Sequence, residues 1–214
     1  MKDQKIQVNI SNLARRIDRR ESIIGQFSNK SEYLTNIVLA KEHKIGALGL
    51  WKTFVEIVEK EKQRNSDYFI FCEDDHLFTE NYNYAILEDN IIKANNLGAD
   101  ILSGGMSWID LPVQCDDSLF WVNKFNGMQF TVIFSRFYDI ILSLKDNEGY
   151  VLDNKISEIS DNIFVVYPFI SVQKEFGYSD VTIQNNTLNY VVNLFKLSEH
   201  KLGILNNVRS AYKL

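Results

Sequence analysis

The stretch YFIFCEDDHLF, residues 68–78, places an uninterrupted apolar run directly before three consecutive carboxylates, Glu73, Asp74 and Asp75. An apolar run without polar alternation is typical of a central strand that is buried on both faces. Neighbouring carboxylates raise one another's pKa values unless a cation or water lies between them. The triplet is therefore either a solvated turn after the strand or an acidic site that the strand holds in place.

Strand and helix patterns alternate on both sides of this stretch. Polar–apolar alternation predicts a strand at 6–11, and apolar residues at helical spacing predict a helix over 47–64. Further strands are predicted at 36–40, 100–102, 120–122, 128–135 and 163–168. Further helices are predicted within 12–27 after a loop, at 84–96, after Ser135 as N-cap, and from about 187. The pattern predicts an α/β fold of one domain, residues 1–214, with a mostly parallel central sheet flanked by helices.

Composition narrows the class of protein. The net charge is −5, so the chain lacks the basic footprint of a nucleic-acid-binding protein. Cys72 and Cys115 stand in dissimilar contexts without a CxxC pair, which fits a reducing compartment. The N-terminal residues 1–11 lack the apolar core of a signal peptide, and no apolar stretch approaches membrane-spanning length. We therefore expect a cytoplasmic protein.

The acidic triplet is predicted to lie where α/β proteins bind ligands. In open α/β sheets, ligands bind at the carboxyl ends of the strands. Glu73 and Asp75 share one side of an extended backbone, and Asp74 faces the other. Carboxylate oxygens suit Mg²⁺ or Mn²⁺, which one or two carboxylates plus substrate phosphates can hold. A metal-dependent nuclease or phosphatase would use the same chemistry.

A run of arginines follows the first predicted strand. Arg15, Arg16, Arg19 and Arg20 lie at the start of the next helix, where the helix dipole favours anions over cations. A bound diphosphate would relieve that conflict, because the planar guanidinium matches phosphate geometry. The alternative is an ordinary solvated face.

Several separated segments, taken in order, resemble the family 25 glycosyltransferases, the group of lipooligosaccharide and collagen galactosyltransferases. These segments are NLARRIDRRE (12–21), IGALGLWKTF (45–54), FCEDDHLF (71–78), GMQFTVIFSR (127–136), LDNKI (152–156) and YPFISVQKEFGYSDV (167–181). The resemblance implies a GT-A fold and transfer of a hexose, with galactose from UDP-galactose as the expected donor. It also implies an inverting reaction in surface glycan, lipooligosaccharide or lipopolysaccharide biosynthesis, with a glycan or lipid-linked glycan as acceptor.

The same resemblance assigns expected roles to individual residues. Glu73 and Asp75 are the expected metal ligands for Mn²⁺ or Mg²⁺. Asp153 is the first candidate for the general base and Asp180 the second; a helix N-cap is the alternative for Asp153. The nucleotide-sugar donor is expected to contact Asn12, Arg16, Arg19, Glu73, Asp74 and Gln173. Gln173 is alternatively a surface residue, and His76 either joins the metal site or is a bystander.

The resemblance has a gap in its second segment. Ala47, Leu50 and Trp51 stand where that family has Cys, Ser and His. The alternative to an active transferase is therefore a catalytically silent relative that binds nucleotide sugars or glycans.

The C-terminal segment, about 186–214, is basic and rich in apolar residues. Its only acid is Glu199, against Lys196, Lys201, Arg209 and Lys213. The segment predicts a helix that packs on the sheet with its cations in solvent. The alternative is weak peripheral contact with an anionic membrane, on its inner face, close to a lipid-linked acceptor.

Overall fold

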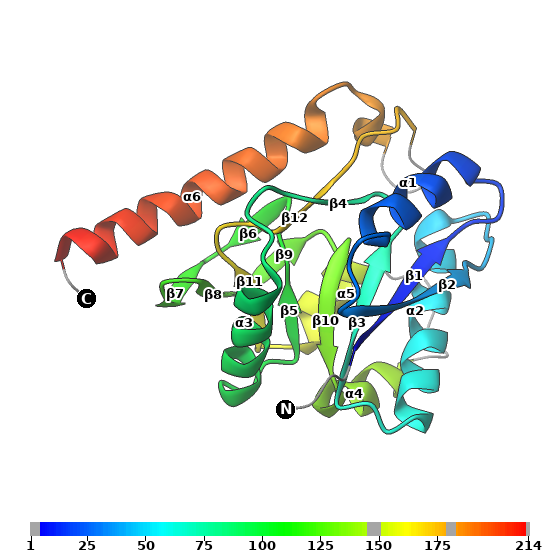
Figure 1. Cartoon of the computed structure of the whole chain (residues 1–214), viewed down its shortest axis with the longest axis horizontal. Helices are drawn as coiled ribbons and strands as arrows, with labels where there is room; N and C mark the ends of the chain where they lie inside the picture. The colour runs from blue at the N-terminus through cyan, green and yellow to red at the C-terminus, as the bar shows by residue number, and fades with distance from the viewer. Residues whose placement is uncertain (1–4, 145–150, 179–182, 213–214) are drawn as a thin grey trace.

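The computed structural model describes residues 5–144, 151–178 and 183–212, and its centre is an eight-stranded sheet (Figure 1). The strand order is β2 (Tyr33–Leu39), β1 (Ile6–Asn12), β3 (Tyr68–Glu73), β10 (Phe130–Phe134), β5 (Ile101–Ser103), β11 (Ile163–Val166), β8 (Leu119–Val122) and β7 (Val113–Asp116). Two small sheets accompany it, β12 (Ser171–Gln173) with β4 (His76–Phe78), and β6 (Trp108–Asp110) with β9 (Lys124–Asn126).

The central sheet is mostly parallel, as the sequence predicts. Of its eight strands, only β10 and β8 are antiparallel to the others. The apolar run of β3 is buried on both faces: Phe69 and Phe71 join one hydrophobic cluster, and Ile70 and Cys72 join the other. The α/β prediction is confirmed, and so is the prediction that 68–72 forms a central strand.

Helices cover both faces of the sheet. The cluster that contains Phe69 includes side chains from α2 (Gly46–Gln63), α4 (Tyr138–Leu142), α5 (Leu152–Ile159) and α6 (Tyr190–Tyr212). The opposite cluster includes side chains from α1 (Ile17–Phe27) and α3 (Tyr84–Asn96). Two short 3₁₀ turns, η1 (Ser135–Phe137) and η2 (Ile183–Asn186), complete the described elements.

The chain creates a crevice at the carboxyl ends of β1 and β3. Strand β1 lies between β2 and β3 and runs parallel to both. The helix that follows β1, α1, packs on one face of the sheet, and the helix that follows β2, α2, packs on the other. A sheet whose connections diverge in this way leaves room for a ligand between them.

The structure corrects two details of the sequence-based prediction. Ser135 does not cap an α-helix: it opens the 3₁₀ turn η1, and α4 begins only at Tyr138. The short strands β4, β6, β7, β9 and β12 were not predicted from the sequence. The helix 84–96 has the predicted bounds, and the Asn83 side chain caps it by accepting a hydrogen bond from the Ile86 backbone N–H.

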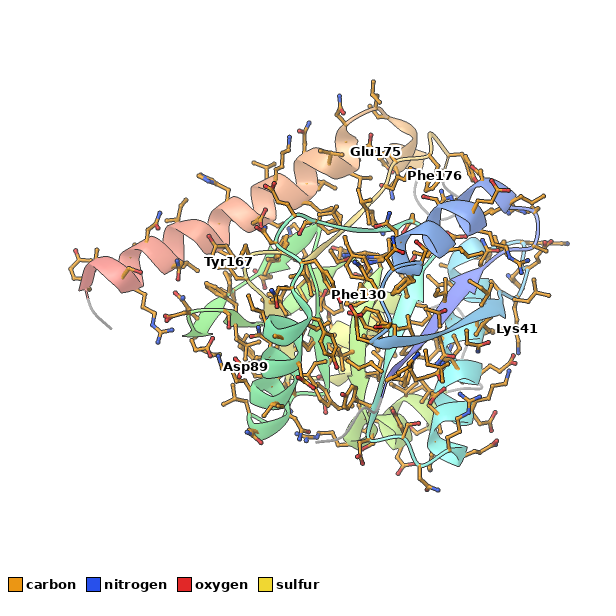
Figure 2. All side chains as sticks on the ribbon, viewed as in Figure 1. Lys41, Asp89, Phe130, Tyr167, Glu175 and Phe176 are labelled. Carbon is orange, nitrogen blue, oxygen red and sulfur yellow. The ribbon has the colours of Figure 1, made fainter. Side chains whose placement is uncertain are left out.

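Helix α6 begins against the body of the protein and then extends past β7 (Figure 1). The Glu175 carboxylate lies at its start (Figure 2) and accepts hydrogen bonds from the backbone N–H groups of Asn189, Val191 and Val192. An anion is favourable there because the first N–H groups of a helix lack partners within the helix. None of the described helices is long and apolar enough to cross a membrane.

Candidate functional site

The acidic triplet lies at the carboxyl end of β3, beside the end of β1. The two strands pair with Ser11 opposite Glu73, so the residue after Ser11 is close to the triplet. Asn12 donates a hydrogen bond to Asp74 Oδ2 over 2.9 Å. Arg16 Nη1 and Arg19 Nη1 lie 3.4 Å and 3.3 Å from Asp74 Oδ1. Asp74, which is 4% exposed, therefore binds the arginine segment. Residues 74 and 75 form a turn after β3, and Arg19 Nη1 contacts both carboxylates, so the prediction that Asp74 faces away from Asp75 on an extended backbone is wrong.

Arg19 is held by the protein from several sides. Its Nη1 lies 3.1 Å from Asp75 Oδ2, and its Nη2 donates to the Tyr178 carbonyl oxygen over 2.6 Å. The rings of Phe176 and Tyr178 lie 4.8 Å and 4.6 Å from the guanidinium carbon. Cations stack favourably on such aromatic faces. Arg19 is only 5% exposed.

These contacts change the expected role of the arginine segment. The cations at the start of α1 do not need a diphosphate to relieve the conflict with the helix dipole, because Asp74 and Asp75 already supply negative charge. Asn12, Arg19 and Asp74 all have partners within the protein. Asn12 and Arg19 thus hold the acidic triplet in place through Asp74. Direct contact of Asn12, Arg19 and Asp74 with a donor stays a prediction.

The electrostatics of the triplet favour the binding of a cation. Burial, followed by the negative charges of Asp75, Asp74 and Asp153, raises the pKa of Glu73 well above its usual range. Burial also raises the pKa of Asp75 to about 6, although the charge of Arg19 opposes this. Asp75 Oδ1 is buried and has no hydrogen-bond partner among the described residues. A cation bound by Glu73 and Asp75 Oδ1 would relieve both the repulsion and the missing contact.

The described residues contain no group of three or more His, Cys, Asp or Glu side chains placed to hold a metal ion. Two carboxylates remain, Glu73 and the free oxygen of Asp75. This pair fits Mg²⁺ or Mn²⁺ when substrate phosphates complete the coordination, because Mg²⁺ is often held by only one or two protein carboxylates. It does not fit a metal that needs a full cage of protein ligands.

The triplet opens into a cavity of about 710 Å³. This cavity brings together predicted site residues that are far apart in the sequence, namely Arg16, Arg19, Glu73, Asp75, Asp153 and Gln173. Gln173 ends β12, which pairs with β4 directly after the triplet. Asp180, the second candidate for the base, lies outside the described residues.

Asp153 faces this cavity from the first turn of α5. Its Oδ2 accepts hydrogen bonds from Asn126 Nδ2 over 3.0 Å and from the Gly127 backbone N–H over 3.1 Å. Gly127 has a φ of 109°, a conformation that favours glycine, and this conformation presents its N–H to Asp153. The N-cap of α5 is Val151, so the N-cap alternative for Asp153 is wrong.

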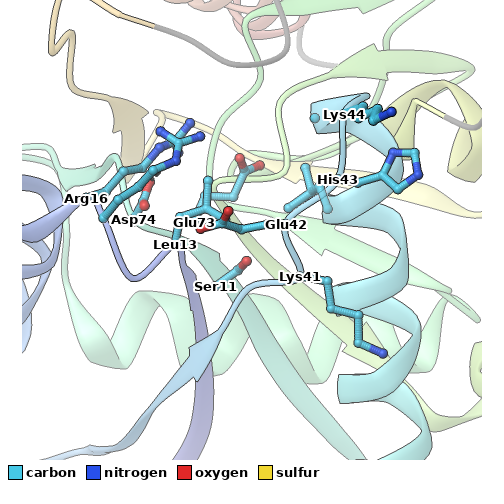
Figure 3. A pocket seen from close by; sticks show the side chains of 12 residues that line it. Ser11, Leu13, Arg16, Lys41, Glu42, His43, Lys44, Glu73 and Asp74 are labelled. Atoms are coloured by element: carbon cyan, nitrogen blue, oxygen red, sulfur yellow. Dashed lines mark hydrogen bonds and ion pairs between the residues drawn. The ribbon is translucent and has the colours of Figure 1, made fainter.

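A second cavity, of about 510 Å³, adjoins the first and shares Arg16, Leu50 and Glu73 with it. Its walls are the ends of β1 and β3 and the loop before α2. Figure 3 shows Arg16 beside Asp74 on one side, with His43 and Lys44 on the other. The loop is fixed to α2 because the Lys41 backbone N–H donates to Thr53 Oγ1 over 2.8 Å. The walls carry four cationic side chains, Arg15, Arg16, Lys41 and Lys44, and three carboxylates, Glu42, Glu73 and Asp74.

Several residues that line the larger cavity were not predicted from the sequence. Trp108, Lys124 and Asn126 come from the short strands β6 and β9, and Tyr190 comes from the first turn of α6. Asn126 directly precedes the GMQFTVIFSR segment, and this position next to a family-like segment was the one sign in the sequence that Asn126 belongs to the site. Nothing in the sequence around Trp108 or Tyr190 distinguishes them from core aromatics.

His76 does not line either cavity. It is 1% exposed, its ring stacks on Phe130 with centroids 4.7 Å apart, and its Nδ1 lies 2.8 Å from Ser171 Oγ. Burial, with a smaller contribution from the charge of Lys30, lowers its pKa to about 3. The position of His76 therefore supports its interpretation as a bystander to the metal site.

His76 is expected to make the protein sensitive to acid. Its pKa is lower in the folded state than the roughly 6.5 of an unfolded histidine, so the unfolded state binds more protons between these values. Stability from this residue is fully present above about pH 6.5 and is lost as the pH falls towards 3. Relative to His76→Gln, the wild type should lose up to about 1.4 kcal/mol of unfolding free energy per pH unit below pH 6.

Urea unfolding at pH 7, 6, 5 and 4 would measure this difference. His43→Gln, the same substitution at an exposed position, offers a control for the exchange of the side chain itself. A constant difference between His76→Gln and the wild type across this range would show that His76 titrates normally in the folded protein.

No protein-family model matches the chain, and no curated protein matches it. Several solved structures are similar to the structure of this chain, at low sequence identity. UDP-glucose pyrophosphorylase in its apo form is 9% identical, with 92% of this chain and 82% of that chain covered and a TM-score of 0.48. A glycosyltransferase involved in glycosylation of the major capsid of PBCV-1 is 12% identical, with 76% and 81% covered and a TM-score of 0.47. Mannose-1-phosphate geranyltransferase from Thermus thermophilus is 7% identical, with 76% and 73% covered and a TM-score of 0.43.

Proposed function

We propose that this protein is a metal-dependent glycosyltransferase that moves a sugar from a nucleotide-diphosphate donor to a glycan acceptor. One observation carries the proposal. Glu73 and Asp75, at the carboxyl end of the central strand, face the same cavity as Asp153, about 80 residues later in the chain. Two carboxylates that can hold a cation beside the leaving diphosphate, and a separate, well-oriented carboxylate that can act as base, are the groups that an inverting sugar transfer of this kind needs.

The donor is proposed to bind across the two adjoining cavities. The smaller cavity takes the nucleotide, because arginine and lysine side chains in its walls can bind a diphosphate. The larger cavity takes the sugar and the acceptor. Arg16 and Glu73 line both, so they lie at the junction where the diphosphate meets the sugar.

Glu73 and Asp75 would hold Mn²⁺ or Mg²⁺ at this junction. When bound, the metal neutralises negative charge on the departing diphosphate. Arg19 fixes Asp75 through one carboxylate oxygen and leaves the other, Oδ1, for the metal. Asn12 and Arg16 fix Asp74 in the same way behind the site, so the loop after β3 keeps its shape.

Asp153 is the proposed general base. The hydrogen bonds from Asn126 and Gly127 orient its carboxylate towards the cavity. The acceptor hydroxyl loses its proton to Asp153 as its oxygen forms a bond to the anomeric carbon. The bond from that carbon to the phosphate oxygen breaks on the opposite side, and the nucleoside diphosphate leaves with the electron pair. The configuration at the anomeric carbon is thereby inverted.

The identity of the sugar rests on the sequence resemblance alone. On that ground we propose UDP-galactose as donor and a growing surface glycan, free or lipid-linked, as acceptor. The resemblance covers most of the chain in order, which is the reason for preferring a hexosyltransferase over a metal-dependent phosphatase or nuclease.

A thermal-shift screen of nucleotide sugars with and without Mn²⁺ tests the proposal. The expected result is a higher melting temperature with a UDP-sugar and Mn²⁺ together than with either alone, because each completes the other's binding site. Slow release of UDP from the same donor would identify an enzyme, and its absence would identify a silent relative. Stabilisation by metal alone, together with hydrolysis of simple phosphate esters, would identify a phosphatase and overturn the proposal.

The role of Asp153 gives a separate prediction. Asp153→Asn should lower kcat for transfer by about 100-fold or more and leave the donor dissociation constant nearly unchanged, because a general base acts in the transition state. Exposed Asp161 offers a control at which Asn should leave the rate unchanged. If Asp153→Asn weakens donor binding and leaves kcat intact, Asp153 is a binding residue and the base lies elsewhere.

Peripheral membrane contact is a further part of the proposal. The single acid of α6, Glu199, faces the protein, where it accepts a hydrogen bond from the Phe169 backbone N–H over 2.8 Å. The exposed side of the helix includes Lys196 and Lys201 together with apolar residues, namely Leu197, Ile204, Val208 and Tyr212. A basic helix with an exposed apolar stripe suits an anionic bilayer surface.

Co-sedimentation with vesicles would test this contact. Binding is expected to vesicles that contain phosphatidylglycerol, and it should weaken at high salt and in Lys196→Glu/Lys201→Glu. Equal binding to purely zwitterionic vesicles, or no binding at low salt, would leave α6 as a packed helix only.

A further inference from the structure

Trp108 is a large aromatic residue that the fold leaves 42% exposed, and it lines the larger cavity. It lies on β6, where alternate residues face opposite sides. Ile109, the next residue, is buried in the hydrophobic cluster, so Trp108 is directed away from that core. Most of a tryptophan surface is apolar, and exposing it to water is unfavourable. Because Trp108 lies in a cavity wall, its half-exposed ring presents an apolar face that a ligand can cover.

The strand register places Trp108 beside the candidate base. Trp108 pairs with Asn126 on β9, and Asn126 Nδ2 donates the 3.0 Å hydrogen bond to Asp153 Oδ2. The two positions are thus joined by one strand pair and one hydrogen bond. A ligand that lies on the Trp108 ring is held close to the carboxylate that would accept its proton.

A second aromatic residue, Tyr190, lines the same cavity from another part of the chain and is 39% exposed. It begins α6, and the backbone on either side of it is fixed, because Glu175 accepts hydrogen bonds from the N–H groups of Asn189 and Val191. Polar side chains of Lys124 and Asn185 lie in the same wall. The cavity therefore combines two aromatic faces with groups that can bind hydroxyls.

We infer that Trp108, with Tyr190, forms the platform on which a pyranose ring of the acceptor stacks while its hydroxyl is presented to Asp153. One face of a pyranose carries C–H groups with partial positive charge, and the face of an aromatic ring is negative, so the two attract. The polar side chains around the rings bind the hydroxyls at the sugar's edge, as in other sites that combine apolar walls with a few polar groups. The assignment of the platform to the acceptor rests on the proposed function.

Glycan binding tests the platform without requiring catalysis. Fluorescently labelled protein, with UDP and Mn²⁺ present, would be applied to an array of mammalian and bacterial oligosaccharides. The wild type is expected to bind at least one of them. Trp108→Ala should lower that affinity about tenfold or more, and Trp108→Phe, which keeps a ring face, should retain most of it. The control Tyr212→Ala, at an aromatic residue that is 74% exposed on the far turns of α6, should bind as the wild type does.

Donor hydrolysis separates failure of the platform from failure of the proposed function. Water replaces the acceptor in that reaction, so the wild type should release UDP in the absence of an oligosaccharide, and this release reports on the proposed function without the platform. Transfer to the bound oligosaccharide should fall in Trp108→Ala, and an unchanged melting temperature would show that the variant is folded.

Three results would overturn the platform: no binding of the wild type to any oligosaccharide, equal binding by Trp108→Ala, or equal loss in Trp108→Phe and Trp108→Ala. If donor hydrolysis is absent but binding still depends on the Trp108 ring, the glycan site stands and the transferase proposal fails.

Discussion

Arg19→Ala is expected to destabilise the protein by about 3–5 kcal/mol, the range for removing one partner of a buried ion pair. The substitution leaves Asp74 and Asp75 without the cation that contacts both of them at 3.3 Å and 3.1 Å. It also removes the group that stacks on Tyr178 and donates to the Tyr178 carbonyl oxygen. Urea unfolding at pH 7.5 in EDTA would measure the loss, since a bound metal would replace part of the missing charge.

Two further variants make this prediction specific. Arg20 is exposed and adjacent, so Arg20→Ala should change the unfolding free energy by less than about 0.5 kcal/mol. Adding Asp75→Asn to Arg19→Ala should recover part of the loss, because the second change removes one of the uncompensated charges. A loss below about 1 kcal/mol for Arg19→Ala is the value typical of exposed salt bridges. It would show that Arg19 does not hold Asp74 and Asp75 in place.

Glu73→Gln is expected to lower the rate of sugar transfer and to raise the stability of the metal-free protein. It should lower the transfer rate by more than about 100-fold, because the electrostatic stabilisation lost at the leaving diphosphate is worth several kcal/mol and roughly 1.4 kcal/mol is tenfold in rate. In EDTA it should also stabilise the fold, because it removes a carboxylate whose charge is disfavoured by burial and by repulsion from Asp75, Asp74 and Asp153. Exposed Glu59 provides a control at which Gln should change neither quantity.

The stabilisation should depend on pH in a defined direction. The pKa of Glu73 is raised in the folded state, so between the unfolded and folded values the folded state binds more protons. Wild-type stability from this residue therefore falls as the pH rises above the unfolded value of about 4.3. The advantage of Glu73→Gln should be small at pH 4 and largest at pH 8. An advantage that shrinks towards pH 8 would show that the folded state does not raise the pKa of Glu73.

The sequence by itself determined the central strand, the acidic triplet at its end and the α/β class. Strand 68–72 is recognisable because burial on both faces requires a continuous apolar run, and helix 84–96 because its pattern spans several turns. The position of Glu73 and Asp75 at the carboxyl edge of the sheet follows from these elements, since parallel strands of an α/β sheet present their carboxyl ends together.

Only the tertiary structure decided which side chains meet. Whether Arg19 binds a ligand or the protein depends on the loop at Phe176 and Tyr178, more than 150 residues away, and no local pattern encodes that approach. The same holds for Asn126 and Asp153, and for the exposure of Trp108, whose three-residue strand has no periodicity to read. Local propensity and burial pattern fix the elements, whereas contacts between distant loops follow from how the elements pack.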